Sequence, residues 1–563
     1  MNDVACTYVV RRRGWVTHAC LCLCLAGTVA LESAFAADAG PQVGIRGGIL
    51  QGVTAANVSA FKGIPYAQPP VGTLRWRPPV PAVAWDGVRD ASKFGPACLQ
   101  PPAQPKDLYF DGVLPQSEDC LTLNVWTPSG AKNLPVMVWI HGGSLVGGSS
   151  AEPMYDGVRP AQHGIILVSI NYRLGLLGYL AHPALSAESA QHLSGNYGLL
   201  DQIQALHWVQ DNIAAFGGDP RQVTIAGESA GALSVIALMS SPKARGLFAR
   251  AISESGYMPA YAKLHEAAWG LPSAETAGAT MATLAGARDA AQLRAVDLTT
   301  LFLAGLKTGW QPEPVIDGVV LLRQFAETFA RGEQARVPVL AGFNEGEIRS
   351  LLGLMPKTPA TQAAYVQDVR SRFGAHSAAY LALYPGAEPR ADVMAALRDG
   401  LYGYAAQNLV RQQAALGQPA YLYFFRHSTP AERARDLAAF HASELPYVFG
   451  RVGPGTVLGP NWPQPPQSSV ESELAEGMMS YWTSFVRTGR PKASGEPDWP
   501  RYTRQQHNYL DIDERPAATR DLTPAAFAFA STLVDERIRQ GQAWRLNIGF
   551  AAFPARAATD EHH

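Results

Sequence analysis

Short runs rich in apolar residues recur along the chain, and polar stretches that contain Gly, Pro, Asn or Asp separate them. Apolar runs of this length are typical of strands that are buried on both faces of a parallel sheet. We expect each run to form a strand of a central sheet. The runs cover residues 134–140, 165–170, 222–226, 248–253, 337–343 and 420–426.

Helical patterns lie between these runs. Residues 199–216 repeat apolar positions with the helical period and end at a Gly-Gly-Asp-Pro stop over residues 217–220. Residues 232–239 contain no Gly or Pro and also predict a helix. Nearer the N-terminus, residues 43–60 alternate apolar and polar positions, which predicts small hairpin strands. Because strands alternate with helices, we expect an α/β protein with a mostly parallel, doubly wound sheet.

The overall composition agrees with a large buried core and a nearly neutral surface. Hydrophobic residues make up 47% of the 563-residue chain, and 46 Lys and Arg balance 47 Asp and Glu. A net charge of -1 provides no basic face, so we do not expect nucleic acid as a partner. Several domains are usual for this length, but one α/β domain with long insertions also reaches it.

The first 36 residues have the pattern of an export signal. Three arginines at residues 11–13 precede an apolar run over residues 19–31, which is too short to span a bilayer comfortably. Residues 34–36 read Ala-Phe-Ala, a small-x-small cleavage site. We expect residues 1–36 to be a signal peptide and the mature protein to be periplasmic or secreted. An uncleaved anchor is the alternative, and no later stretch predicts a second span.

Cysteine usage agrees with export. Four of the six cysteines lie within residues 1–36, so the expected mature chain keeps only Cys98 and Cys120. An exported chain with two cysteines most simply forms one disulfide. Two free buried thiols are the alternative.

A Gly-Glu-Ser-Ala-Gly motif over residues 227–231 carries the clearest chemical signal. A predicted strand precedes the motif and a predicted helix follows it, which is the context that a G-x-S-x-G nucleophile elbow needs. Ser229 then stands at the tip of a tight turn, beside a helix N-terminus that favours negative charge. Two glycines let the backbone pack closely on both sides of the turn.

A serine hydroxyl needs a base, an acid that orients the base, and donors for the oxyanion. His-Gly-Gly-Ser over residues 141–144 follows a predicted buried strand. Small residues there let backbone N–H groups approach a substrate oxygen, and the N–H of Ala230 adjoins the nucleophile. We expect Gly143, Ser144 and Ala230 to form the oxyanion hole.

Many ordered motifs between about residues 43 and 502 resemble those of the type-B carboxylesterases, the family that includes cholinesterases. The resemblance implies the α/β-hydrolase fold, a small-molecule ester as substrate, and no metal or cofactor. It also favours one domain over residues 37–555 and a C-terminal tail over residues 556–563, and it implies a disulfide between Cys98 and Cys120. The motifs are FKGIPYA (61–67), SEDCLTLN (117–124), NYRLG (171–175), GNYGLLDQ (195–202), FGGDP (216–220), the elbow and YWTSF (481–485).

The resemblance assigns the base to His441. Residues 440–450 read FHASELPYVFG, and the family's histidine segment likewise places an acidic residue and an aromatic-Val-Phe-Gly run after the His. His441 follows both the nucleophile and the acid, which is the expected chain order. Two weaker correspondences concern Glu228, which adjoins the nucleophile and is placed to influence the charge of His441, and Ser255, which resembles a serine near the acid.

The acid is either Glu345 or Glu347. The family pattern places Glu five residues after a Gly that follows a buried strand, usually within Asp-Glu-Gly. Matching the letters Glu-Gly selects Glu345, whereas counting from Gly342 selects Glu347. A two-residue shift along an extended backbone moves a carboxylate by about 6–7 Å, which is too far to keep one hydrogen bond. We therefore predict Glu347, and we expect an extended backbone after Gly342.

These residues predict an exported carboxylic-ester hydrolase with Ser229, His441 and Glu347 as its triad. The alternative is a binding protein of the same fold, but such relatives lack a triad member, whereas this chain has a full candidate set. A cholinesterase is a poor fit because the loop between the cysteines has Tyr109 and Phe110 but no Trp for a cation. Lipase, polyester and toxin-ester specificities stay open, and the oligomeric state is not predicted.

Overall fold

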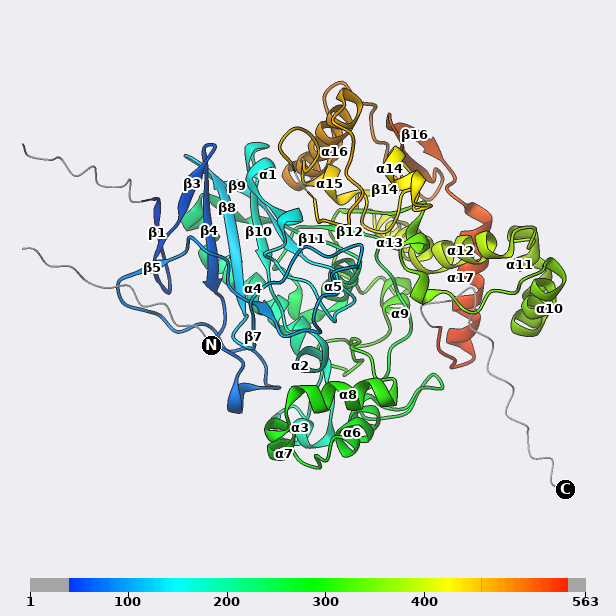
Figure 1. The fold of residues 1–563 in the computed structure, drawn as a ribbon, viewed down its shortest axis with the longest axis horizontal. Helices are drawn as coiled ribbons and strands as arrows, with labels where there is room; N and C mark the ends of the chain where they lie inside the picture. Colours follow the sequence, from blue (N-terminus) through cyan, green and yellow to red (C-terminus); the bar gives the residue numbers. More distant parts are fainter. Residues whose placement is uncertain (1–39, 457, 545–563) are drawn as a thin grey trace, which may run out of the picture. The chain divides into compact units, whose positions relative to one another are not determined.

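The computed structural model of the protein describes residues 40–456 and 458–544, which lie in one compact unit. Its centre is an eleven-stranded sheet (Figure 1). In spatial order the strands are β16 (Ala517–Arg520), β15 (Asn508–Ile512), β14 (Ala420–Phe425), β13 (Val339–Asn344), β12 (Arg250–Glu254), β11 (Gly218–Glu228), β9 (Leu134–Ile140), β10 (Ile166–Ile170), β8 (Thr122–Pro128), β4 (Val58–Pro65) and β3 (Val53–Ala55).

The middle of the sheet is parallel and its two edges are antiparallel. Strands β15, β14, β13, β12, β11, β9 and β10 run parallel to their neighbours. Strands β8, β4 and β3 at one edge and β16 at the other pair in the antiparallel sense. Each of the six apolar runs in the sequence forms one of the parallel strands, so the prediction of a mostly parallel sheet is confirmed.

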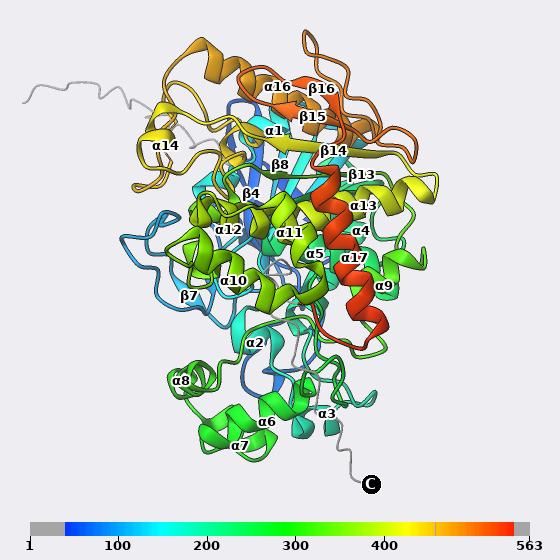
Figure 2. The same ribbon diagram turned by 90° about the vertical axis from the view of Figure 1, so that its right-hand side faces the viewer.

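Helices lie on both faces of the sheet and in two insertions, as Figures 1 and 2 show. They are α1 (Val158–Gln162), α2 (Gly175–Tyr179), α3 (Pro183–Ala187), α4 (Tyr197–Asn212), α5 (Ala230–Ser240), α6 (Ala274–Leu284), α7 (Ala290–Ala295), α8 (Leu298–Thr308), α9 (Phe325–Ala330), α10 (Gln362–Phe373), α11 (Ser377–Leu383), α12 (Pro389–Arg398), α13 (Tyr404–Ala415), α14 (Pro430–Ala434), α15 (Leu445–Val448), α16 (Ser469–Thr488) and α17 (Pro524–Arg539).

Strand β9 shows how one apolar run serves two cores. Val136, Val138 and Ile140 join the core that contains α4, α5, α9 and α13. Met137 and Trp139 point the other way and join the core beneath α15 and α16. Successive side chains of a strand alternate between the two faces of a sheet. A strand with helices on both faces must therefore be apolar throughout, which explains the unbroken run.

Two long insertions extend the α/β core. Helices α6, α7 and α8 follow β12 and pack with α2 and α3 into a helical lobe, which lies at the bottom of Figure 1. Helices α10 to α13 separate β13 from β14. One domain with insertions therefore accounts for the length of the described chain, whereas the limits at residues 37 and 555 stay predictions.

Smaller elements precede the sheet. Strands β1 (Gln42–Ile45) and β2 (Gly48–Gln51) form the expected hairpin, and β2 also pairs with β5 (Val88–Asp90). Strands β6 (Ala97–Cys98) and β7 (Gln116–Ser117) close the base of the loop that a Cys98–Cys120 disulfide spans. The predicted signal peptide (1–36) and tail (556–563) lie outside the described residues. Within the described residues, no helix is both long and apolar enough to cross a membrane.

Candidate active site

Ser229 occupies a strained turn between strand β11 and helix α5. Its backbone angles are φ 56° and ψ -119°, a conformation that L-residues rarely adopt and that persists only where the surroundings hold it. A Cβ added to Gly231 would lie 2.0 Å from the carbonyl oxygen of Ile140, and one added to Gly227 would lie 2.5 Å from the carbonyl carbon of Gly231. Both glycines are therefore needed for β9, the turn and α5 to pack together.

The loop after β9 lies directly against this turn. A Cβ on Gly142 would come within 3.3 Å of the Ser229 Cβ. Gly143 and Ser144 follow with φ of 98° and 57°, and both are exposed. Among the described residues, no protein acceptor takes the N–H of either residue. Ala230 is the first residue of α5, so its N–H has no acceptor within the helix. Gly142 thus holds the start of this loop against the nucleophile turn, and all three predicted oxyanion donors are available.

His441 and Glu347 form a buried ion pair. The imidazole Nδ1 lies 2.5 Å from Glu347 Oε2, and the Glu347 side chain is completely buried. The other carboxylate oxygen accepts hydrogen bonds from the Ser255 hydroxyl (2.6 Å) and the Asn344 N–H (2.8 Å). Because both carboxylate oxygens are held, the ring orientation is held too, and Nε2 points away from Glu347.

Glu345, the other candidate for the acid, has an exposed side chain and does not contact His441 in the described structure. The chain reaches Glu347 by a different path from the one that we expected. Strand β13 continues to Asn344, two residues beyond Gly342, and a 3₁₀ turn begins at Glu347. The backbone after Gly342 is therefore extended only as far as Asn344, and the expectation of an extended path up to Glu347 is wrong. Gly346 N–H donates to the Ala439 carbonyl (2.7 Å), which joins this turn to the segment before His441.

Glu228 occupies the other side of the imidazole ring. Its Oε1 lies 3.0 Å from His441 Nε2, the nitrogen that faces away from Glu347. Within the described residues, no hydrogen bond joins the Ser229 hydroxyl to His441, although both side chains are buried. Hydrogen bonds of catalytic groups are often long before substrate binds, so this geometry is compatible with a serine–histidine pair.

Buried carboxylates set the charge of this site. Burial acts to lower the pKa of His441, but the negative charges of Glu228 and Glu347 outweigh burial and raise the pKa to about 9. Burial raises the pKa of Glu228 to about 8; the neighbouring His441 opposes that rise, and Glu444 adds to it. Burial and the charge of Glu347 raise the pKa of Glu444 to about 7. The site therefore favours a protonated imidazole near neutral pH.

Tyr109 is a contact of His441 that the sequence did not reveal. Its hydroxyl donates to the backbone carbonyl of His441 (2.9 Å) and lies 2.8 Å from Ser350 Oγ. Tyr109 belongs to the loop between Cys98 and Cys120, so the disulfide-closed loop reaches down to the histidine segment. The sequence shows Tyr109 only as one aromatic residue of a Pro-rich loop, with no spacing that links it to His441.

No sequence pattern indicated that Tyr402 and Asn344 belong to this site either. The Tyr402 ring centroid lies 5.2 Å from that of His441, and Tyr402 sits in a π-helical turn (Asp399–Gly403) between α12 and α13. The Asn344 amide donates to Glu444 Oε2 (2.5 Å) and to the Phe440 carbonyl (2.9 Å). Ser255, in contrast, contacts Glu347 as its resemblance to the family serine implied.

The chain is similar to known proteins over most of its length. Residues 39–530 match the model of a family described as "Carboxylesterase family". The chain is 39% identical over 468 residues to a fumonisin B1 esterase of Sphingopyxis macrogoltabida. That match covers 81% of this chain and 84% of that protein. It is 34% identical over 486 residues to a para-nitrobenzyl esterase of Bacillus subtilis (strain 168). That match covers 83% of this chain and 93% of that protein.

Solved structures agree with the family match. A PNB esterase superimposes with a TM-score of 0.76 at 32% identity, and the match covers 87% of this chain and 99% of that one. The predicted α/β-hydrolase fold is therefore confirmed.

Proposed function

Because the chain belongs to the carboxylesterase family and is a carboxylic-ester hydrolase, we propose that it is an exported serine esterase that works through an acyl-enzyme. The observation that carries this proposal is the buried contact of 2.5 Å between His441 Nδ1 and Glu347 Oε2, near a serine held in a strained elbow. An oriented base beside a nucleophile is what acyl transfer to serine requires.

In the acylation step, the Ser229 hydroxyl oxygen attacks the ester carbonyl carbon, and His441 Nε2 accepts the hydroxyl proton. The Glu347 carboxylate keeps the Nδ1–H in place and stabilises the imidazolium that forms. The N–H groups of Gly143, Ser144 and Ala230 bind the oxyanion of the tetrahedral intermediate. The intermediate then collapses: the imidazolium donates its proton to the alkoxide oxygen, and the alcohol leaves.

In the deacylation step, water replaces the alcohol. His441 Nε2 takes a proton from water as the water oxygen attacks the acyl carbon, and the same donors bind the new oxyanion. Collapse of this intermediate returns the proton to Ser229 and releases the carboxylic acid. Every proton transfer uses Nε2, so Glu228 must move from Nε2 or share the proton when substrate binds.

The test uses p-nitrophenyl acetate with the intact protein and two single variants. We expect a burst of p-nitrophenol from the native chain, and a loss of turnover on the order of 10⁴–10⁶-fold in Ser229→Ala and His441→Ala. Glu345→Gln is the matched control for folding and handling. Near-native turnover in either triad variant would contradict the assignment and favour another nucleophile, whereas no turnover by the native chain would favour a binding protein.

A panel of esters that differ in their acyl and alcohol groups then tests the substrate range. Fumonisin B1 belongs in that panel because a relative with 39% identity is named for its hydrolysis. Short, long and aromatic esters complete it, since loops build the substrate pockets of such folds and loop sequences do not reveal pocket shape.

A further inference from the structure

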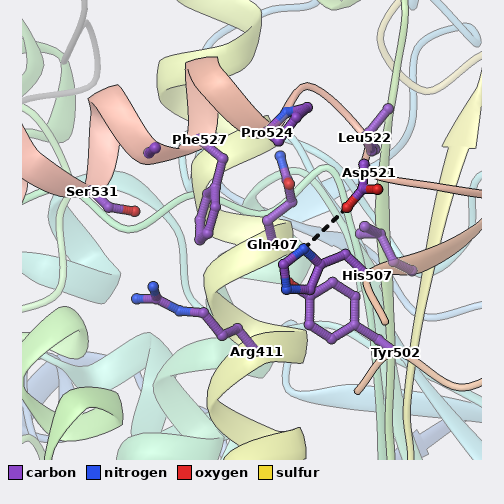
Figure 3. Close-up of a pocket in the computed structure, with 11 residues that line it drawn as sticks. Gln407, Arg411, Tyr502, His507, Asp521, Leu522, Pro524, Phe527 and Ser531 are labelled. Atoms are coloured by element: carbon purple, nitrogen blue, oxygen red, sulfur yellow. Dashed lines mark ion pairs between the residues drawn. The ribbon is translucent and has the colours of Figure 1, made fainter. Parts of the chain in front are cut away.

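A cavity of about 200 Å³ lies between helices α13 and α17 and shares no lining residue with the proposed catalytic site. Figure 3 shows Gln407 and Arg411 of α13 facing Phe527 and Ser531 of α17. The segment around β15 closes a third side. The cavity has no role in the mechanism described above, and the sequence patterns did not indicate it.

Aromatic rings held by other side chains line much of this cavity. The Tyr502 ring stacks on His507 with centroids 5.2 Å apart and planes at 16°. His507 Nδ1 in turn lies 3.2 Å from Asp521 Oδ1. Across the cavity, the Arg411 guanidinium lies 5.1 Å from the Phe527 ring centroid. Two supported rings therefore offer faces to a flat apolar group.

Two polar groups that line the cavity have few partners within the described structure. The Ser531 hydroxyl is buried and makes no hydrogen bond within the described structure. Arg411 forms no ion pair with a carboxylate among the described residues; its guanidinium donates to the Asn408 side-chain carbonyl at 3.3 Å. A guanidinium has five N–H donors, so several remain for another acceptor. In Figure 3, Arg411 and Ser531 lie at one end of the cavity and Asp521 at the other.

We propose that this cavity binds a small carboxylate that carries a single ring. The carboxylate accepts hydrogen bonds from Arg411 and Ser531, away from Asp521, and the ring packs between Tyr502 and Phe527. The size agrees: a cavity of about 150 Å³ accommodates benzene, whereas drug-sized ligands occupy roughly 300–1,000 Å³. The proposal does not depend on the catalytic triad, although ester hydrolysis releases molecules of this class.

The test measures binding of benzoate and of uncharged benzamide, which has the same shape, by titration calorimetry. We expect benzoate to bind at least about tenfold more tightly than benzamide, because a hydrogen bond to a charged group contributes more than a neutral one. Arg411→Gln should abolish that difference. Ala528→Phe, at an exposed lining position of α17, should block benzoate without changing p-nitrophenyl acetate turnover more than about twofold.

Competition with the ester distinguishes benzoate bound in this cavity from benzoate bound at the catalytic centre. In the native protein, benzoate bound in this cavity should not compete with p-nitrophenyl acetate, whereas benzoate bound at the catalytic centre should. The proposal fails if millimolar benzoate does not bind, if Arg411→Gln and Ala528→Phe leave its affinity unchanged, or if all binding competes with the ester. The exposed Ala528→Phe variant keeps the test decisive even if Arg411→Gln does not fold.

Discussion

Glu228 Oε1 lies 3.0 Å from His441 Nε2, the nitrogen that takes the serine proton in the proposed mechanism. Glu347 holds the opposite nitrogen at 2.5 Å, so the buried imidazole lies between two carboxylates. An imidazolium in that position is stabilised from both sides, whereas catalysis begins from the neutral ring. We therefore expect the activity of the site to depend on pH through Glu228.

We predict that Glu228→Gln shifts the pH profile of kcat/KM to lower pH. The two carboxylates raise the pKa of His441 to about 9, so kcat/KM of the native enzyme should rise as pH increases through that value. Removing the charge of Glu228 destabilises the imidazolium and lowers its pKa, which moves the acid limb down by about one pH unit or more. Glu345→Gln is the control, and an acid limb that stays at its native position in Glu228→Gln would refute the link.

Glu347→Gln should reduce kcat by roughly 10²–10⁴-fold, by analogy with loss of the orienting acid in other triads. Glu345→Gln, two residues away and exposed, should change kcat by less than about tenfold. Steady-state kinetics on the two variants provides the comparison. The opposite order of effects would show that Glu345 is the acid in solution.

Tyr109→Phe should lower kcat about two- to tenfold with little change in KM, because it removes one hydrogen bond to the backbone of His441. The acid limb of the pH profile should stay in place, because burial raises the pKa of Tyr109 well above its ordinary value and the phenol is uncharged over that limb. Tyr365→Phe is a matched control, because its hydroxyl also bonds to a backbone carbonyl, that of Tyr384. If both variants lose the same activity, Tyr109 has only a structural effect.

Loss of the disulfide should destabilise the protein. Cys98 and Cys120 are joined across a sequence separation of 22, and a loop of this length is worth about 3 kcal/mol on the loop-entropy model. The double variant Cys98→Ser, Cys120→Ser should therefore show a lower free energy of unfolding by about that amount in guanidinium titrations. Oxidised and reduced native protein with equal stability would argue against the pairing.

Export predicts a mature N-terminus at Ala37. N-terminal sequencing of protein recovered from the periplasm or the medium checks the cleavage site directly. Retention of residues 1–36 in a membrane fraction would favour the uncleaved anchor instead.

Local patterns along the chain were enough to predict the strands of the parallel sheet and the elbow at Ser229. A buried parallel strand must be apolar on both faces, and a strained strand-to-helix turn needs glycine on both sides of its serine. These requirements act on residues that are neighbours in sequence, so the chain displays them directly. Strand β15, which is parallel to β14, and the edge strand β16 leave no such local signature. The π-helical turn at Asp399–Gly403 and the cavity at Arg411 leave none either.

Only the tertiary structure decided which side chains surround His441. Glu347 lies 94 residues before His441, Tyr109 lies 332 residues before it, and Glu228 reaches its ring from the nucleophile turn. Counting from Gly342 selected Glu347, but the backbone reached it through a 3₁₀ turn rather than an extended segment. Contacts between distant segments depend on how loops fold over the ends of the strands, and the geometry of those loops is set by packing that no short stretch of sequence encodes.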